Sequence, residues 1–379
     1  MLMPRFKLLK NALFAGALGI ACLITACSGP AKPVPKPLEP VVGLLGVKQA
    51  WSASGGGLSV SAEPRAIGQQ ILLGSVDGDV RAVDAISGVA TWQLGVGAPV
   101  VSGVGGDGAT FAVVTDADEL VVLSSSKVLW RQRLGAPSLT TPLVAGARIF
   151  TLSTDRTVSA FDAASGRRIW QQQRSSDSLV LAQPGLLMAV GDTLVAGVGG
   201  RLIGFNALTG QARWDVPVAV SRGTNEVERL VDLVAGATRI DESLCVRAFQ
   251  AAVACVDTAS GRLTWSRTAA GATGLGGNES IVVGTEKDSR LTVWNRRTGE
   301  VSWSSDALLW RALGTPLVLG KSLAVGDGMG QLHFLATADG AILNRVSTDG
   351  SSIIGAPVLV GKTLVVATQK GGIFAFRPE

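Results

Sequence analysis

Short runs of apolar residues, either continuous or alternating with polar residues, recur along the chain and are separated by turn residues. VRAVDA at 80–85 and TVSAFDA at 157–163 are typical examples. Alternation with a period of two predicts a half-buried β-strand, and a short continuous apolar run is typical of a strand buried on both faces. Almost no segment beyond the N-terminus has helical periodicity. The pattern predicts an all-β protein.

A nine-residue phrase follows many of these runs, with an Asp or Asn at its start, a Gly four residues before its end and a Trp at its end. It reads DAISGVATW, DAASGRRIW, NALTGQARW, DTASGRLTW and NRRTGEVSW, beginning at residues 84, 162, 206, 257 and 295. The tryptophans at 51, 92, 130, 170, 214, 265 and 303 are spaced by 38 to 51 residues, and Asn344 continues the series. A repeat of this length indicates a stacked or radial repeat fold with eight units.

Each phrase has the chemistry of a turn between two antiparallel strands. The Asp or Asn side chain accepts hydrogen bonds from backbone N–H groups two or three residues further on, and the Gly adopts a positive φ. A second turn lies one strand earlier, as in SVDGDV at 75–80 and GDGMGQ at 326–331. Four antiparallel strands and a tryptophan in about 40 residues are typical of a β-propeller blade, in which the indole covers the gap between neighbouring sheets. The chain is therefore predicted to be an eight-bladed β-propeller.

The two ends of the repeat region complement each other. TLVVATQKGGIFAF at 363–376 provides inner strands without a following tryptophan strand, whereas VKQAW at 47–51 is a tryptophan strand without preceding partners. Pairing of the N- and C-terminal strands would complete one blade and remove the exposed sheet edges. We expect a closed ring over residues 42–379. A row of open β-sandwiches is the alternative, and it leaves these ends unexplained.

Residues 1–26 are predicted to be a secretory signal peptide. The first ten residues carry three basic side chains and no acidic one, and an apolar run follows at 12–26. The run ends in ITAC, which resembles the bacterial lipobox and implies cleavage after Ala26 and lipid attachment to Cys27. Ser28 resembles the sorting signal for the outer membrane. An uncleaved transmembrane anchor is the alternative reading.

Residues 27–41 are predicted to connect the acylated cysteine to the propeller. SGPAKPVPKPLEP at 28–40 holds five prolines and no apolar periodicity. A proline-rich segment of this length forms an extended, semi-rigid spacer on the order of 40 Å long. Attachment by two or more acyl chains is stable, so the propeller itself would need no membrane-binding face.

The positive charge of the chain is not evidence for nucleic-acid binding. The chain has 34 basic and 29 acidic residues, and removal of the signal peptide with its three basic residues leaves 31 against 29, a net charge of +2. No basic run with interleaved aromatic residues is present. We expect no nucleic-acid partner.

Two cysteines remain when Cys22 leaves with the signal peptide and Cys27 is acylated. Cys245 and Cys255 lie on the two arms of one hairpin. A three-residue turn would place them opposite each other and allow a disulfide, whereas a two-residue turn would place them on opposite faces; a disulfide and two buried thiols are both open. The single histidine, His333, is expected to pack within a strand, and no metal site is predicted.

Catalytic motifs are absent from the sequence. GxSxG, HExxH, a phosphate-binding loop and clustered carboxylates do not occur, and no helix follows GVGG at 197–200 to bind a phosphate. We predict no catalytic residue. An enzyme would require a cofactor held in the propeller channel.

The phrase is similar to the repeat of pyrroloquinoline-quinone propellers, and the whole layout resembles the family of outer-membrane assembly factor B (BamB), lipoproteins of the β-barrel assembly machine. The more particular resemblances are AWSAS at 50–54, GTNEVERLVD at 223–232 and the segment 304–335. The resemblance implies a cofactor-free, non-enzymatic scaffold at the periplasmic face of the outer membrane. It would bind the periplasmic POTRA domains of BamA and assist unfolded outer-membrane proteins to fold and insert.

Two unusual connections are the candidates for the partner-binding surface. They follow Trp170 and Trp214, are consecutive in the ring and leave it on the same face. Both mix charged residues with leucines, as expected of a surface that grips another protein. Leu179, Leu181 and Leu230 are the candidates, and the alternative is that these leucines only fasten the connections to the ring.

The family resemblance refines this choice, because the partner-contact stretches of the family read Leu-x-Leu-Arg and Asp-x-Asp. Both leucines of the first stretch are present, but Ala182 stands at the arginine position. Asp232 matches the first aspartate, and Val234 replaces the second. Arg229 could supply charge nearby. The departures weaken the expected charge contacts and favour the two leucines and Asp232.

Two rival functions share the fold. Quinone-dependent dehydrogenases resemble this chain in scaffold, but they hold the quinone with adjacent cysteines or with dense Arg, Asp and His side chains and a cation. This chain has no Cys-Cys pair and no second histidine. A propeller that binds cell-wall polysaccharide should expose stacked aromatic residues, and most tryptophans here belong to the repeat.

Overall fold

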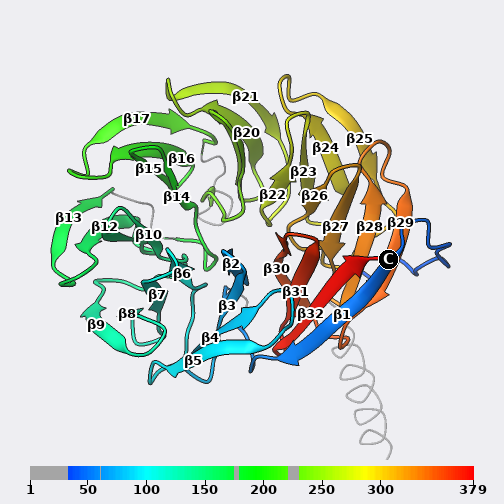
Figure 1. Cartoon of the computed structure of the whole chain (residues 1–379). Coiled ribbons are helices and arrows are strands. Elements are labelled where there is room, and N and C mark those ends of the chain that lie inside the picture. The colour runs from blue at the N-terminus through cyan, green and yellow to red at the C-terminus, as the bar shows by residue number, and fades with distance from the viewer. Residues whose placement is uncertain (1–32, 60, 175–178, 221–229) are drawn as a thin grey trace, which may run out of the picture. The chain divides into compact units, whose positions relative to one another are not determined.

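The repeat units fold as four-stranded antiparallel sheets arranged in a ring (Figure 1). The structure is a computed structural model that describes residues 33–59, 61–174, 179–220 and 230–379. Within these ranges there are eight such sheets, and the chain from Lys36 to Glu379 forms one compact unit. The predicted eight-bladed β-propeller is confirmed. Across the described part of the chain, no helix is long and apolar enough to span a membrane.

Seven blades are built from consecutive strands, and the eighth combines the two ends of the repeat region. The strands of blades 1 to 4 are β2 (Arg65–Ile67), β3 (Gln70–Gly74), β4 (Asp79–Asp84), β5 (Ala90–Gly95); β6 (Gly105–Gly106), β7 (Phe111–Val114), β8 (Glu119–Leu123), β9 (Val128–Arg133); β10 (Leu143–Ala145), β11 (Arg148–Leu152), β12 (Thr157–Asp162), β13 (Arg168–Gln173); β14 (Leu187–Val190), β15 (Thr193–Val198), β16 (Arg201–Asn206) and β17 (Ala212–Pro217). Those of blades 5 to 8 are β18 (Thr238–Ile240), β19 (Ser243–Ala248), β20 (Ala252–Asp257), β21 (Arg262–Thr268); β22 (Leu275–Gly277), β23 (Ile281–Thr285), β24 (Leu291–Asn295), β25 (Val301–Ser305); β26 (Leu317–Leu319), β27 (Ser322–Gly326), β28 (Gln331–Ala336), β29 (Ile342–Ser347); β30 (Ile353–Val360), β31 (Thr363–Thr368), β32 (Gly372–Pro378) and β1 (Val47–Ser54).

Where a blade carries the repeat phrase, the phrase contacts the tryptophan of the blade before it. In blade 6 the Asn295 side chain accepts hydrogen bonds of 3.0 Å from the N–H groups of Arg297 and Thr298, and Gly299 has a φ of +69°. A Cβ atom on Gly299 would lie 2.5 Å from the indole of Trp265 in blade 5. The glycine is therefore needed twice, once for the backbone conformation and once for the contact with the indole.

The same indoles also donate hydrogen bonds to the phrase of the next blade. The indole N–H groups and their carbonyl acceptors are Trp51 with Ala85 (3.1 Å), Trp130 with Ala163 (2.7 Å), Trp170 with Ala207 (3.1 Å), Trp265 with Arg296 (2.7 Å) and Trp303 with Thr337 (2.9 Å). Each acceptor directly follows the first residue of the phrase or its equivalent. A buried indole N–H requires such a partner, so these contacts fix the register of one blade against the next.

The ring is closed by the pairing of β1 with β32, as the sequence predicts. The two strands are antiparallel, with Val47 opposite Pro378 and Ser54 opposite Gly372. The apolar core lies between neighbouring blades, and one of its clusters joins Ile71 and Val83 of blade 1 to Val365 and Ile373 of blade 8. The closing blade is therefore packed in the same way as the others.

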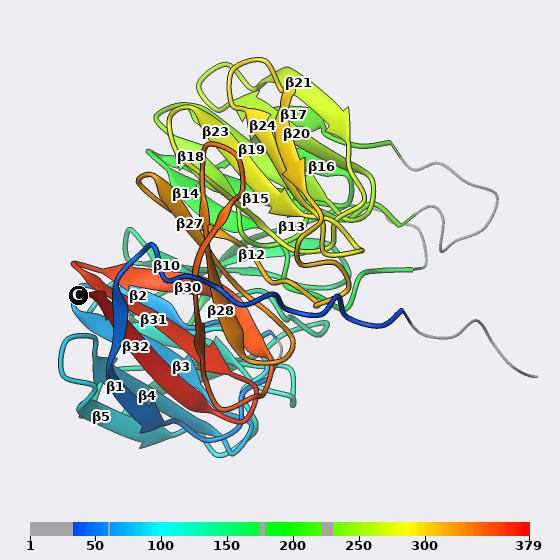
Figure 2. The same ribbon diagram turned by 90° about the vertical axis from the view of Figure 1, so that its right-hand side faces the viewer.

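Blade 7 is followed by the closing blade, whose strands β32 and β1 come from opposite ends of the chain and are not joined by a turn phrase. The chain enters β1 at this place, and the Asn344 side chain donates a hydrogen bond of 2.6 Å to the carbonyl of Leu45. Residues 36–46, which we call the strap, cross the outside of this blade (Figure 2). Residues 36–41, which the sequence assigns to the tether, are thus part of the compact unit.

A buried charged cluster supports blade 7. His333 lies in β28 and its Nε2 is 2.9 Å from Asp327, while Arg311 donates to the same carboxylate oxygen at 2.7 Å. Burial lowers the pKa of His333 against the opposing effect of Asp327. Burial would raise the pKa of Asp327, but hydrogen bonds from His333 and from two backbone N–H groups outweigh it and hold the pKa below its usual range. His333 therefore packs within a strand as expected and is neutral near pH 7.

Replacement of Gly299 tests the contact between phrase and indole. Gly299→Ala should lower the free energy of unfolding by about 1 kcal/mol for the positive φ and by about 1–3 kcal/mol more for displacement of the Trp265 indole. Gly320→Ala is the matched control, because Gly320 has a φ of +61° and nothing lies within 4 Å of its Cβ position. Urea unfolding of both variants measures the difference, and equal destabilisation would contradict the role of the indole.

Replacement of His333 tests the buried cluster through pH. Because the folded-state pKa of His333 is lowered, the unfolded chain takes up the proton first as the pH falls below about 6.5. The free energy of unfolding should then fall by up to about 1.4 kcal/mol per pH unit. His333→Gln should remove this dependence, since the chain has one histidine. Urea unfolding between pH 7.5 and 5.5 gives both slopes, and parallel slopes would refute the assignment.

Candidate partner-binding site

The two unusual connections lie side by side on one face of the ring. They join β13 to β14 and β17 to β18, and their described parts are residues 174 and 179–186 in the first and residues 218–220 and 230–237 in the second. An isolated β-bridge pairs Gly185 with Val234, and Ala235 N–H donates a hydrogen bond of 2.8 Å to the Pro184 carbonyl. The connections therefore form a single surface, as their consecutive positions in the ring predict.

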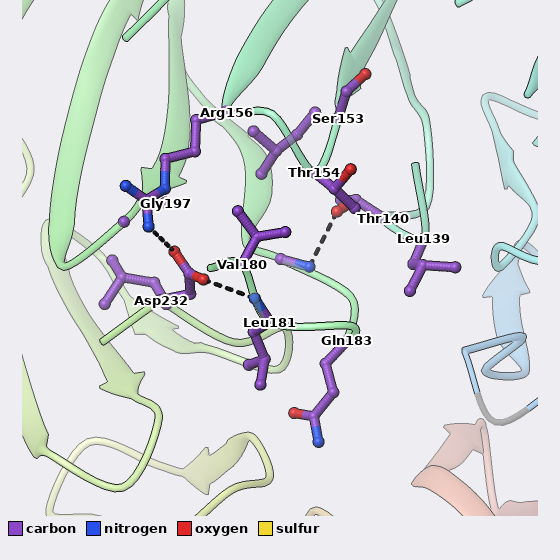
Figure 3. A pocket seen from close by; sticks show the side chains of 14 residues that line it. Leu139, Thr140, Ser153, Thr154, Arg156, Val180, Leu181, Gln183, Gly197 and Asp232 are labelled. Carbon is purple, nitrogen blue, oxygen red and sulfur yellow. Dashed lines mark hydrogen bonds and ion pairs between the residues drawn. The ribbon is translucent and has the colours of Figure 1, made fainter. Parts of the chain in front are cut away.

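Asp232 joins the two connections to each other and to blade 3 (Figure 3). One carboxylate oxygen accepts a hydrogen bond of 2.9 Å from the Leu181 N–H, and the other lies 3.2 Å from Arg156 Nη2. The carbonyl of Asp232 also accepts a hydrogen bond of 2.9 Å from the Phe249 N–H. The side chains of Asp232 and Arg156 are 16% and 15% exposed. Partial burial makes this ion pair stronger than a fully exposed one.

Close backbone packing fixes the second connection against blade 4. Leu233 N–H donates a hydrogen bond of 3.0 Å to the Gly199 carbonyl, and a Cβ atom on Gly197 would lie 2.7 Å from the Leu233 Cβ. Leu233 and Val234 are both buried. Val234, at the position of the second family aspartate, therefore packs in the interior.

The structure brings Leu181 and Asp232 together. Leu179 lies two residues before Leu181 on the first connection, and Leu230 lies two residues before Asp232 on the second. All three leucines are half-buried, while Ala182, at the arginine position of the family pattern, is exposed. Arg229 and Cys27 lie outside the described residues. The sequence did not identify Arg156, whose turn STDR at 153–156 belongs to blade 3 and whose φ is +63°. The turn itself was the only signal, because nothing in the sequence connects residue 156 to residue 232.

The pocket between these residues is too small for a substrate. It has a volume of about 40 Å³ and is lined by Leu139, Thr154, Val180, Gln183 and their neighbours. Such a space holds a few water molecules at most. These residues can therefore form a contact surface for another molecule, in which apolar side chains surround a fixed ion pair.

A larger cavity of about 380 Å³ is lined by residues from the connections of several blades. Its polar lining includes Glu63, Thr285, Glu286 and Lys287. Burial raises the pKa of the Glu63 carboxyl group, and the positive charge of Arg65 opposes this effect. Across the described ranges, no three His, Cys, Asp or Glu side chains are grouped to hold a metal ion.

The two cysteines of blade 5 lie opposite each other. Residues 249–251 form the connection between β19 and β20, and the register pairs Cys245 with Cys255. Both are buried, and the structure joins them in a disulfide. The link crosses one hairpin and fixes two strands that are already paired.

These features define a class of protein, the β-propellers with pyrroloquinoline-quinone-like repeats. The family described as outer membrane protein assembly factor BamB matches residues 76–305. The chain is 35% identical over 380 residues to outer membrane protein assembly factor BamB of Burkholderia pseudomallei, covering 98% of this chain and 100% of the relative. The chain belongs to the BamB family of outer-membrane assembly factors.

Solved structures agree with the fold. The crystal structure of BamB from Moraxella catarrhalis superimposes with a TM-score of 0.79 at 22% identity and covers 87% of this chain and 99% of that one. The quinohemoprotein alcohol dehydrogenase of Comamonas testosteroni superimposes with a TM-score of 0.67 at 14% identity and covers 89% of this chain and 77% of that one. At these identities the likeness is one of fold alone.

Peptide mapping tests the disulfide. Trypsin cleaves after Arg239, Arg247 and Arg262, so the two cysteines fall on separate peptides, 240–247 and 248–262. Without reductant the two peptides should appear as one linked species by mass spectrometry, and reduction should separate them. Replacing both cysteines with Ala should lower the free energy of unfolding by about 2–3 kcal/mol. Detection of the separate peptides in unreduced protein exported from cells would show that the thiols are free.

Proposed function

We propose that this chain is a non-enzymatic scaffold lipoprotein of the outer-membrane β-barrel assembly machinery. It binds the periplasmic POTRA domains of BamA through the surface of the two connections and so assists the folding and insertion of outer-membrane proteins. Family membership supports the assembly role. The surface is our assignment, and the bridging carboxylate of Asp232 is the observation that carries it.

The geometry of Asp232 favours a prepared binding surface. Its carboxylate holds the Leu181 backbone at 2.9 Å and the Arg156 guanidinium at 3.2 Å, so the part of the first connection around Leu181 is held in place before any partner arrives. Ordering a loop in advance lowers the entropy cost of association. We therefore assign Asp232 a positioning role and expect the direct contacts to come from the apolar side chains around it.

The half-buried leucines supply the apolar part of the surface. Leu179, Leu181 and Leu230 are partly covered by the ring and keep the rest of their surface available. A partner that covered this remaining area would gain hydrophobic contact beside a fixed ion pair, a combination typical of the centre of a protein interface. Arg229 is assigned to the charged rim of this site.

Attachment of lipid to Cys27 would hold the propeller at the periplasmic face of the outer membrane. A tethered scaffold and a partner in the same membrane meet at a high effective concentration, so moderate contact energies are sufficient for binding. This arrangement uses the ring to orient the partner and requires no bond chemistry.

The apolar contact predicts the behaviour of a double variant. Leu179→Ala with Leu181→Ala should weaken capture of BamA by about 10- to 100-fold, because each truncation removes on the order of 1 kcal/mol of interface contact. The thermal unfolding midpoint should change little, since both side chains are only partly buried in the free protein. Quantitative pull-down from detergent-solubilised outer membrane measures the effect.

Leu208→Ala is the matched control for this experiment. Leu208 is 60% exposed and lies in the turn between β16 and β17, on the opposite face of the ring. Its replacement should leave capture unchanged. Unaltered capture by the double variant would remove the two leucines from the site.

A further inference from the structure

The strap is held at its N-terminal end by the connection between β25 and β26. Lys36 N–H donates a hydrogen bond of 2.9 Å to the Leu309 carbonyl, and its ammonium group lies 3.5 Å from Asp306. Arg311, buried beside Asp327, donates to the Lys36 carbonyl at 3.3 Å. The position of Lys36 is therefore coupled to the buried cluster of blade 7.

The strap is also held along its length and at its C-terminal end. Arg345 donates a hydrogen bond of 3.1 Å to the Glu39 carbonyl, and Leu44 N–H donates to the Leu343 carbonyl at 2.9 Å. Leu38 and Leu45 pack against the apolar clusters of blades 6, 7 and 8. The strap is consequently a fixed element that begins at Lys36.

The strap begins at one face of the ring. Every described blade has the same strand order, so all connections from an outer strand to the next inner strand leave on one face. The β25–β26 connection, which binds Lys36, is one of these, and so are the two connections of the partner-binding site. Eight residues lie between Cys27 and Lys36. The nine steps from Cys27 to Lys36 can span at most about 30 Å.

Two exposed apolar residues, Trp310 and Met329, lie near the start of the strap, since the Gly328 N–H donates a hydrogen bond of 2.9 Å to the Arg311 carbonyl and the Lys36 N–H bonds to Leu309. Trp310 is 41% exposed and Met329 is 51% exposed, whereas tryptophans of the repeat cover the gaps between blades. Trp310 has a φ of +59°, and its N–H donates a hydrogen bond of 2.7 Å to the Asp288 carbonyl. The next residue, Arg311, is fixed by the buried Asp327. A strained backbone that presents a tryptophan to solvent indicates a functional surface.

The charges around this pair are mixed with a small positive excess. Asp288, whose carbonyl accepts the Trp310 N–H, is paired with the exposed Arg290 and preceded by the exposed Lys287. The partly exposed Lys36 is paired with Asp306. Three positive against two negative groups leave one net positive charge. Tryptophan beside flexible basic side chains is typical of residues at a membrane–water interface.

We propose that Trp310 and Met329 form a lipid-contacting surface that meets the anionic headgroup region of the membrane carrying the lipid anchor. With lipid on Cys27 and a short segment leading to the fixed strap, this surface would lie within reach of the membrane and turn the same face, with its partner-binding connections, toward it. This inference rests on the proposed lipid attachment at Cys27. It goes beyond the proposed function because anchoring by lipid alone requires no contact between the ring and the membrane.

Site-specific labelling of the full-length, lipidated protein tests the inference. Met329→Cys and Leu208→Cys place a thiol on the two opposite faces, and Lys287→Cys is a second variant on the proposed face. An environment-sensitive fluorophore is attached to each, and the protein is reconstituted in vesicles of phosphatidylethanolamine and phosphatidylglycerol with or without a lipid that carries a quencher near its headgroup. Quenching should be at least about fivefold greater at 329 and 287 than at 208. Adding Trp310→Ser to Met329→Cys should reduce it.

The outcomes separate the inference from the function on which it rests. Protein that floats with the vesicles but is quenched equally at all three positions, or at none, would retain lipid anchoring and overturn the lipid-contacting surface. Labels at 329 that are shielded only after addition of BamA would assign the surface to a protein partner instead and overturn it. Protein that does not float with the vesicles would refute the lipid anchor, and this inference with it.

Discussion

The contact between the tryptophan of one blade and the turn phrase of the next is the interaction on which the structure depends. The indole packs on a glycine that has no Cβ, and its N–H donates to a carbonyl of the same turn, as Trp265 does with Gly299 and Arg296. A four-stranded sheet cannot bury both faces alone, so each blade needs its neighbours. Repetition of one contact gives a constant angle between blades, and the constant angle allows the ring to close.

Closure of the ring gives blade 7 a different contact with the blade that follows it. The chain enters the last blade where a turn phrase would otherwise lie, so Asn344 contacts Leu45 in place of a tryptophan contacting a turn. The strap fills the gap on the outside of blade 7, and Arg311, Asp327 and His333 hold the adjacent connection from within. The site at which the chain leaves the ring is therefore set by ring closure.

In the candidate site a charged residue, Asp232, holds other residues of the chain in place. Asp232 lies at a family contact position, yet both of its carboxylate oxygens have partners within the chain. In the proposed site its contribution would be the fixed position of the Leu181 backbone, and the apolar contacts would follow from that position. The same ring thus positions two surfaces on one face, one proposed for a protein and one proposed for lipid.

The sequence by itself determined the all-β class, the eight units, the turn chemistry of the phrase and the pairing of the two ends, because these follow from local periodicity and from residues at fixed spacing. It also indicated the two connections, since their length and composition depart from the repeat. It could not determine that Arg156 reaches Asp232, that a three-residue turn sets Cys245 opposite Cys255, or that residues 36–41 lie on blade 7. Those contacts join residues from different blades or depend on turn register, and only the closed ring brings them within bonding distance.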